Sequence, residues 1–161
     1  MMYPELIPGD IVITRNEGSD EDENATPGYW NHVGIYVGDD RMVEAQAPGW
    51  GGKVLTSNRI EYMKRYPIIV VKRSLTHAQG VLAAEDAKKS VDTIYRKIAS
   101  LFIFLRKRER GENCVSVVRR AYMEATGRDP KWRTPDDVYN DENLDIVYEH
   151  NELEADHEME S

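Results

Sequence analysis

Residues 31–45, NHVGIYVGDDRMVEA, constrain the fold more than any other segment of the chain. Two short apolar runs flank an Asp-Asp pair, and this pattern predicts a β-hairpin with strands near 33–38 and 41–46. A hairpin needs neither the histidine at its start, His32, nor the glutamate near its end, Glu44, in order to fold. Both side chains are therefore candidates for a functional role.

The remaining elements follow the order strands first, helices second. A Pro-Gly pair followed by β-branched residues predicts a strand at 8–14, and the continuous apolar run at 66–74 predicts a central strand. Apolar residues at three- and four-residue steps predict a long helix from about 78 to 105, capped by Thr76, and a second helix at about 114–126. This order favours an α+β fold in which an antiparallel sheet packs against helices.

Two local signals mark the ends of the later helices. Gly127 is suited to end the second helix, because glycine readily adopts the left-handed conformation found there. Thr134, Pro135 and Asp137 form the start signal of a short third helix.

Length and composition indicate one globular domain. The chain has 161 residues, 40 % of them hydrophobic. Its longest apolar run, at 98–105, is far shorter than the ~20 residues of a transmembrane helix. The first ten residues lack the basic and apolar regions of a secretory signal, and a single cysteine excludes an intrachain disulfide. We therefore expect a protein of the cytoplasm or one delivered by a phage or virus, without a transmembrane segment; the sequence does not predict the oligomeric state.

The negative charge is concentrated in two segments. The chain has 29 acidic and 21 basic residues, and eleven of the acids lie in 17–24 and 149–161. The other 18 acids and 21 bases give the rest of the chain a charge of about +3. Acidic segments that are poor in aromatic residues usually remain disordered. We expect a single domain over 1–148 with a flexible acidic loop near 16–27, followed by a disordered acidic tail over 149–161; a tail that docks on a partner is the alternative.

Cys114 is the candidate nucleophile. It opens the helix at 114–126, with Asn113 available as N-cap. Free backbone N–H groups and the positive end of the helix dipole favour a thiolate there, and the thiolate is the reactive form. The same N–H groups could stabilise an oxyanion. The alternative is that Cys114 is a small buried residue on the apolar face of its helix.

His32 and Glu44 could act as base and orienting group for such a nucleophile, because a carboxylate beside an imidazole fixes its tautomer. The alternative is an ordinary surface histidine and glutamate. With a two-residue loop, Glu44 would pair with Ile35 and point to the face opposite His32. A bulge or an odd loop would instead bring Tyr36 opposite Glu44 and both side chains to one face, so the functional hypothesis requires one of these features.

The glycine-rich segment PGWGGK, at 48–53, contains the candidate substrate-binding residues Trp50 and Gly51. Glycines allow a ligand to approach the backbone closely. An ordinary surface loop is the alternative.

Four segments together resemble the NlpC-type papain-like cysteine peptidase superfamily. NHVGIYVGDDRMVEA resembles its histidine-containing hairpin, and PGDIVIT resembles the Gly-Asp strand ahead of that hairpin. In the usual family order the cysteine comes first. Here NCVSVVRRAY and TPDDVY follow the hairpin, which resembles the circularly permuted, YiiX/YaeF-like branch. The resemblance covers roughly residues 5–147 and implies a circularly permuted papain-like fold.

The resemblance also implies a function. Cys114 would be the nucleophile, His32 the general base and Glu44 the residue that orients the histidine, in a cysteine hydrolase of amide bonds that forms an acyl-enzyme. The implied substrates are peptides, including peptidoglycan fragments, and no metal or other cofactor is needed.

Three alternatives remain open. The permuted branch is also similar to lipid-handling thioesterases and acyltransferases, and the apolar and basic segment at 100–110 could approach a lipid surface or form a helix end packed in the core. A catalytically silent binding protein could use the same fold. A zinc site at His32, Glu44 and Cys114 lacks the short ligand spacing typical of zinc. We expect no nucleic-acid partner for a chain with a pI of about 5.0.

Overall fold

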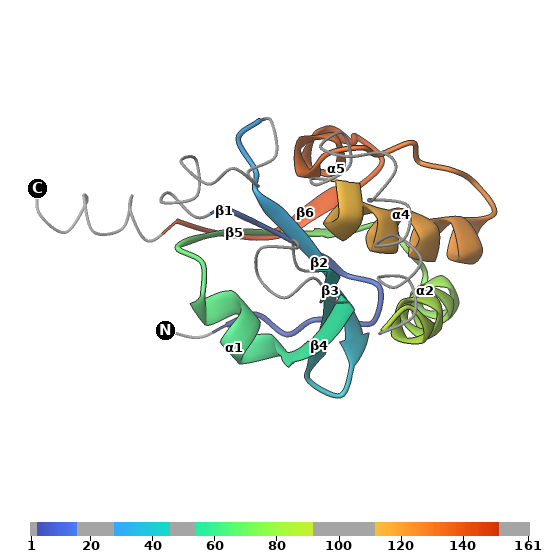
Figure 1. Cartoon of the computed structure of the whole chain (residues 1–161), viewed down its shortest axis with the longest axis horizontal. Helices are drawn as coiled ribbons and strands as arrows, with labels where there is room; N and C mark the ends of the chain where they lie inside the picture. The colour runs from blue at the N-terminus through green and yellow to red at the C-terminus, as the bar shows by residue number, and fades with distance from the viewer. Residues whose placement is uncertain (1–2, 16–27, 46–53, 92–111, 152–161) are drawn as a thin grey trace, which may run out of the picture.

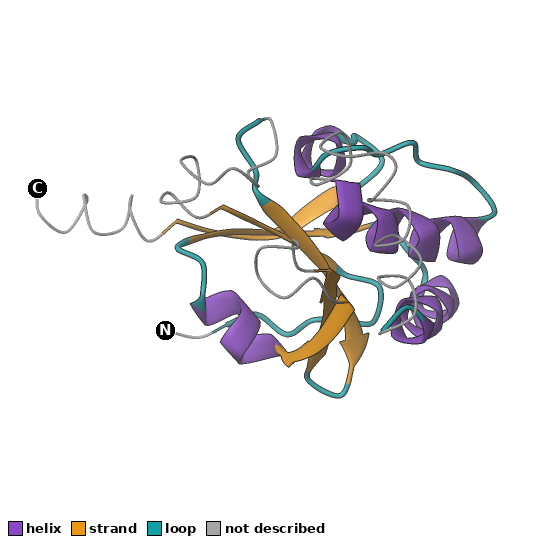
Figure 2. Cartoon of the chain, in the orientation of Figure 1, coloured by secondary structure: helices purple, strands orange, loops and turns teal. Residues whose placement is uncertain are grey.

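The computed structural model describes residues 3–15, 28–45, 54–91 and 112–151. Within these residues the chain forms a six-stranded antiparallel sheet in the order β4-β3-β2-β1-β5-β6. The helices gather in two groups, α2, α4 and α5 toward one side of the sheet and α1 toward the other (Figures 1 and 2). The predicted α+β class and antiparallel sheet are confirmed.

The strands are β1 (Ile11–Arg15), β2 (His32–Gly38), β3 (Arg41–Ala45), β4 (Val54–Asn58), β5 (Ile68–Arg73) and β6 (Asp145–Asn151). The helices are α1 (Arg59–Lys64), α2 (His77–Lys89), α4 (Glu112–Thr126) and α5 (Pro135–Asn140). The sequence predicted β1, β2, β3, β5, α4 and α5 to within a few residues. It did not predict β4, α1 or β6.

The apolar runs of β1 and β5 follow from burial on both faces of the sheet. Ile11 and Val70 belong to the core cluster that includes the buried residues of α2 and α4. Val12 and Val71 belong to a second cluster on the other face, with Tyr62 and Met63 of α1. A strand buried on both faces loses the alternation of apolar and polar residues.

Three helix ends lie where local sequence signals predicted them. Thr76 caps α2 and forms a capping box with Gln79, and Thr134 caps α5 with Pro135 in its first turn. Gly127 follows α4 with a φ of +72°. The predictions at these three helix ends are confirmed.

Two predicted boundaries need correction. α2 ends at Lys89 with Ser90 as its C-cap, so it does not run on to 105 as one continuous helix; residues 92–111, which include the segment 100–110, lie outside the described residues. The segment assigned to the tail, 149–161, begins inside the sheet, because Glu149, His150 and Asn151 pair with β5. The rest of that segment and the acidic loop near 16–27 lie outside the described residues.

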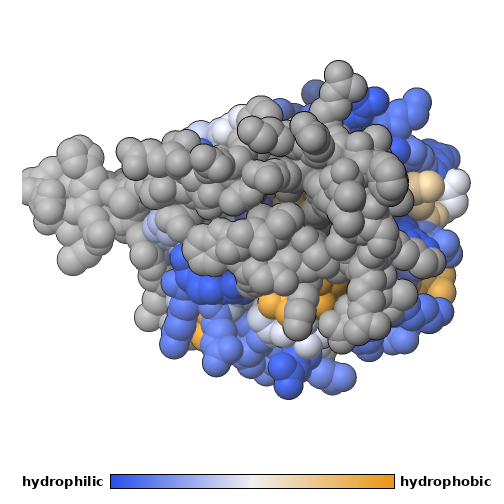
Figure 3. Space-filling view, viewed as in Figure 1, coloured by the Kyte–Doolittle hydropathy of each residue, from blue (hydrophilic) through white to orange (hydrophobic). Residues whose placement is uncertain are grey.

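The described surface visible in Figure 3 is mainly hydrophilic, with hydrophobic areas of limited size. None of the described helices is long and apolar enough to cross a membrane.

Gly80 allows α2 to pack directly on the chain ahead of β1. A Cβ at Gly80 would overlap the carbonyl oxygen of Pro8, a backbone atom that cannot move aside cheaply. Alanine is favoured over glycine inside a helix by about 1 kcal/mol, but overpacking of this kind typically costs about 1–3 kcal/mol.

We therefore expect Gly80→Ala to lower the free energy of unfolding by up to about 2 kcal/mol, since the overlap outweighs the gain in helix propensity. Urea denaturation followed by circular dichroism measures this. Leu82→Ala, at a position in the same helix that is 55 % exposed, should change it by no more than about 0.5 kcal/mol. A more stable Gly80→Ala variant would contradict the close contact.

Candidate active site

The hairpin contains the irregularity that the functional hypothesis requires. Ile35 pairs with Val43 and Tyr36 with Met42, whereas Gly38 pairs with Arg41, so the register shifts between Tyr36 and Gly38. This bulge confirms the predicted irregularity, and it places His32 and Glu44 on one face.

The direction of the shift differs from the prediction. Continuing the register of β2 and β3 puts Glu44 opposite Gly34, not Tyr36. The reason is that the extra residue lies in β2, after Tyr36, while Asp39 and Asp40 keep a tight two-residue turn with φ of 52° and 58°.

Gly34 provides space beside the two side chains. A Cβ there would lie 2.9 Å from the hydroxyl oxygen and 3.0 Å from a ring carbon of Tyr62. Tyr62 is fully buried, and its hydroxyl donates a hydrogen bond to the carbonyl oxygen of Val12 at 3.2 Å. The lack of a side chain at Gly34 thus lets the Tyr62 ring cover this part of the sheet.

His32 is the first residue of β2, where groups from both layers reach it. The rings of Tyr62 and Tyr66 lie 5.8 and 5.9 Å from the imidazole, the Tyr66 ring nearly parallel to it. The Cys114 side chain of α4 interacts with the imidazole and favours its protonated form. His32 Nε2 lies 3.5 Å from Glu44 Oε1, a distance typical of an ion pair and longer than the ~2.7–3.2 Å of a hydrogen bond.

Glu44 is a buried carboxylate, with 1 % of its side chain exposed. Its second oxygen, Oε2, accepts hydrogen bonds from Ser57 Oγ at 2.9 Å and from Arg65 Nη2 at 2.6 Å. Burial raises the pKa of Glu44, but the contacts with His32 and Arg65 outweigh it and lower the pKa to about 2. The carboxylate is therefore ionised throughout the neutral range.

His32 is protonated more readily than an ordinary histidine. Burial lowers its pKa, while Tyr66, Cys114 and Glu44 raise it, and the net result is a pKa well above 6.5. The geometry therefore favours an imidazolium that lies between a sulfur atom and a carboxylate. A thiol, an imidazole and a carboxylate in this order can support nucleophilic acyl transfer.

Cys114 lies in the first turn of α4, which packs against β2 and β3. The helix begins at Glu112, so Asn113 has helical backbone and is not the N-cap that the sequence predicted. Cys114 is 7 % exposed and belongs to the core cluster with Val117, Val118 and Ala121, so it is buried on the apolar face of the helix, as the alternative to a nucleophile describes.

The structure brings together Cys114, His32 and Glu44 from α4, β2 and β3. Trp50 and Gly51 lie outside the described residues. Within the described part of the chain, no group of three or more histidine, cysteine, aspartate or glutamate side chains could hold a metal ion.

Sequence reasoning missed Ser57, Tyr62, Arg65 and Tyr66, which surround Glu44 and His32. Ser57 and Tyr62 belong to β4 and α1, which were not predicted, and Arg65 and Tyr66 follow α1, with Tyr66 at the start of the predicted strand 66–74. One signal was present, because Asn58 followed three residues later by Glu61 has the spacing of a helix start, and Asn58 Oδ1 does accept hydrogen bonds from the backbone of Ile60 and Glu61.

Comparison of the chain with known protein families, with curated proteins and with solved structures gives no match.

The pKa of Glu44 predicts a specific loss of stability in acid. A carboxyl group whose pKa falls from 4.5 to about 2 on folding stabilises the protein above pH 4.5, and the effect is lost as the pH falls toward 2. His32 is protonated in both the folded and unfolded states in most of this range, so it contributes little to the change. Between pH 6 and pH 3 we expect Glu44 to account for a loss of about 2 kcal/mol.

Urea denaturation at pH 6 and pH 3 tests this. The difference between the two free energies of unfolding should shrink by about 2 kcal/mol in Glu44→Gln, although that variant is less stable at both pH values. Glu61→Gln, at an exposed position of α1, should keep the wild-type difference. An unchanged difference in Glu44→Gln would show that this carboxylate is not the group responsible.

Proposed function

We propose that the protein is a cysteine hydrolase of amide bonds, with Cys114 as nucleophile, His32 as general base and acid, and Glu44 as the residue that orients His32. The observation that carries the proposal is the contact of His32 with both other groups, made by side chains from three separate elements. The resemblance of the hairpin and of the α4 segment to the permuted NlpC-type branch supports the proposal. The order of the elements, with the strands ahead of the helix that contains the cysteine, also supports it.

The proposed reaction has two steps. Cys114 Sγ, deprotonated by His32, attacks the carbonyl carbon of the amide, and the imidazolium then gives its proton to the leaving amine as the C–N bond breaks. In the second step His32 takes a proton from water, the hydroxide adds to the thioester, and the carboxylic acid leaves as the C–S bond breaks. No oxidant, reductant or metal takes part.

The start of α4 would stabilise the charge that develops on the carbonyl oxygen. Backbone N–H groups in the first turn of a helix point toward its N-terminal end, and Cys114 lies in the first turn of α4. Glu44 would stabilise the imidazolium between the two steps. In this proposal the fold is a circularly permuted papain-like one, with the sheet placing the base and the helix placing the nucleophile.

The single cysteine makes a direct test possible. Iodoacetamide should alkylate the native protein at pH 6 at least about tenfold faster than it alkylates N-acetylcysteine, since a free thiol with a pKa of about 8.5 is mostly protonated there. The rate, measured by intact mass, should fall to the N-acetylcysteine level or below in His32→Ala.

His77→Ala is the matched control, because His77 is an exposed histidine at the start of α2. It should leave the alkylation rate unchanged. Equal rates in wild type and His32→Ala would mean that the histidine does not activate the sulfur, and the binding-protein alternative would be favoured.

An acyl-enzyme gives the second test. Incubation with p-nitrophenyl acetate should add one acetyl group to Cys114, visible as a mass increase, and the group should be lost with time through hydrolysis. Cys114→Ala should gain no such group. Release of product from peptidoglycan fragments would then identify an amide substrate, whereas release only from acyl lipids would favour the lipid-directed alternative.

A further inference from the structure

The two oxygens of the Glu44 carboxylate have different partners. Oε2 is held at 2.6 Å by Arg65 and at 2.9 Å by Ser57, whereas Oε1 faces His32 Nε2 at the longer distance of 3.5 Å. Neither Nε2 nor Oε1 has another hydrogen-bond partner among the described groups. The orientation of the carboxylate is thus set mainly by Arg65 and Ser57, and not by the histidine.

Arg65 is itself held in place. It is the C-cap residue of α1, and its guanidinium lies over the rings of Tyr62 and Tyr66 at 5.1 and 5.6 Å from their centroids. Cation–π contacts and packing of the stem favour this one arrangement of a side chain that is still 39 % exposed.

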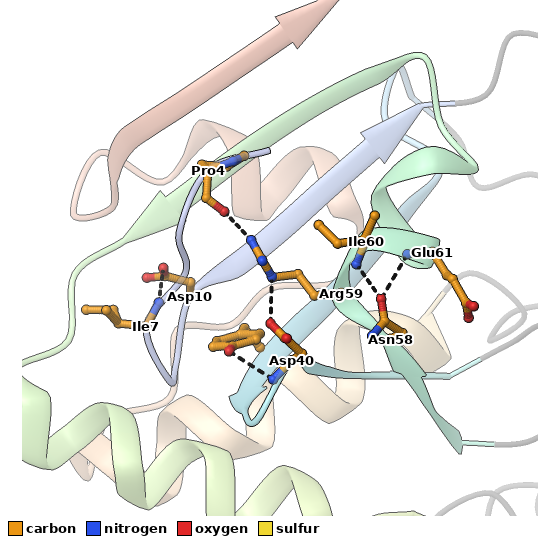
Figure 4. Close-up of polar contacts among 9 residues, drawn as sticks. Pro4, Ile7, Asp10, Asp40, Asn58, Arg59, Ile60 and Glu61 are labelled. Atoms are coloured by element: carbon orange, nitrogen blue, oxygen red, sulfur yellow. Dashed lines mark hydrogen bonds and ion pairs between the residues drawn. The ribbon is translucent and has the colours of Figure 1, made fainter. Parts of the chain in front are cut away.

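The other end of α1 is anchored to the hairpin. Asn58 caps the helix, and Arg59 bridges the Asp40 carboxylate of the β2–β3 turn to the carbonyl oxygen of Pro4, as Figure 4 shows. Because α1 is only six residues long, an anchor at its start also limits the movement of Arg65 at its end. The turn between β2 and β3, the strands of His32 and Glu44, therefore also anchors the helix that precedes Arg65.

From these contacts we infer that Arg65 is a positioning residue that acts on His32 through Glu44. By binding Oε2 it keeps Oε1 directed at the imidazole, and it limits how strongly the carboxylate holds the imidazolium proton. This inference rests on the proposed function, in which His32 must both keep a proton beside the sulfur and release it to the leaving group.

The direction of the effect follows from the charges. The titratable side chains that face His32 and Glu44 are Tyr62 of α1, Arg65 and Tyr66 of the two residues after it, and Cys114 of α4. Arg65 is the permanent cation of this group. Without it, a positive charge near the imidazole is lost and Glu44 is free to turn fully toward His32, and both changes raise the pKa of His32.

Titration of the imidazole by NMR tests the inference. The chain has four histidines, and the signal of His32 is assigned by its loss in His32→Gln. In Arg65→Gln we expect the titration midpoint of His32 to rise by about one pH unit. Arg65→Lys should restore most of the wild-type midpoint, because lysine keeps the charge but not the planar donor pair.

Lys64→Gln is the matched control. It removes an exposed cation from the last turn of the same helix, next to Arg65 in the sequence, so the midpoint should stay at the wild-type value. Arg65→Met, which keeps an unbranched apolar stem between the two rings, replaces Arg65→Gln if that variant does not fold.

The possible outcomes separate three causes. An unchanged midpoint in the charge-free variants overturns the inference. So does a lower midpoint in a folded variant, since it would mean that Glu44 loses its charge or its orientation toward His32. Unfolding also moves the midpoint down, toward about 6.5, and circular dichroism identifies that case. Failure of the proposed function is seen separately, as an iodoacetamide rate in the wild type that does not depend on His32.

Discussion

The burial of the Glu44 charge is the constraint on which this site depends. An ionised carboxylate with almost no exposed surface is strongly unfavourable unless cations and hydrogen-bond donors compensate it. The compensating groups come from three places in the chain: His32 on β2, Ser57 on β4 and Arg65 after α1. A single buried charge on β3 therefore ties together both neighbouring strands and the helix on the same side of the sheet.

The same arrangement explains why a polar cluster is tolerated in a sheet whose central strands are buried on both faces. β1 and β5 contribute apolar side chains to two cores at once. His32 is the first residue of β2, so groups from both faces of the sheet can reach its imidazole. Tyr62 of α1 and Tyr66 after it lie on one side, and Cys114 of α4 interacts from the other. The proposed chemistry depends on this position, because only a residue at the end of a strand is reached by both layers.

The sequence predicted those parts of the fold that have strong local signals. Patterns of only a few residues predict the hairpin, the apolar face of α4 and the caps at Thr76 and Thr134. The three candidate catalytic residues lie on or beside these elements. The roles of Cys114, His32 and Glu44 remain predictions, although the structure brings the three side chains together.

The missed elements are short, and tertiary contacts stabilise them. α1 has six residues and owes its place to Arg59 and Arg65, whose partners, Asp40 and Glu44, are distant in sequence. β6 is an edge strand with Ile146 and Val147 exposed, so it lacks the alternation that marks a half-buried strand. The sequence pattern also did not predict the end of α2 at Lys89, because apolar residues continue at helical spacing beyond it. The need for a bulge was inferred from the proposed chemistry and not from any residue of the hairpin.

The bulge in β2 has a consequence for the evolution of the chain. Side chains alternate between the two faces of a sheet, so the number of residues between two positions of a hairpin determines whether they meet. With a regular two-residue turn and no bulge, a histidine and a glutamate at these places would need a separation of eleven or thirteen residues to share a face, and not the twelve found here. Loss of the bulge at unchanged length, or a single-residue insertion or deletion that kept the bulge, would turn Glu44 to the opposite core while leaving the histidine and the glutamate in the chain. The site can therefore be retained in evolution only if the even spacing between His32 and Glu44 and the bulge in β2 are retained together.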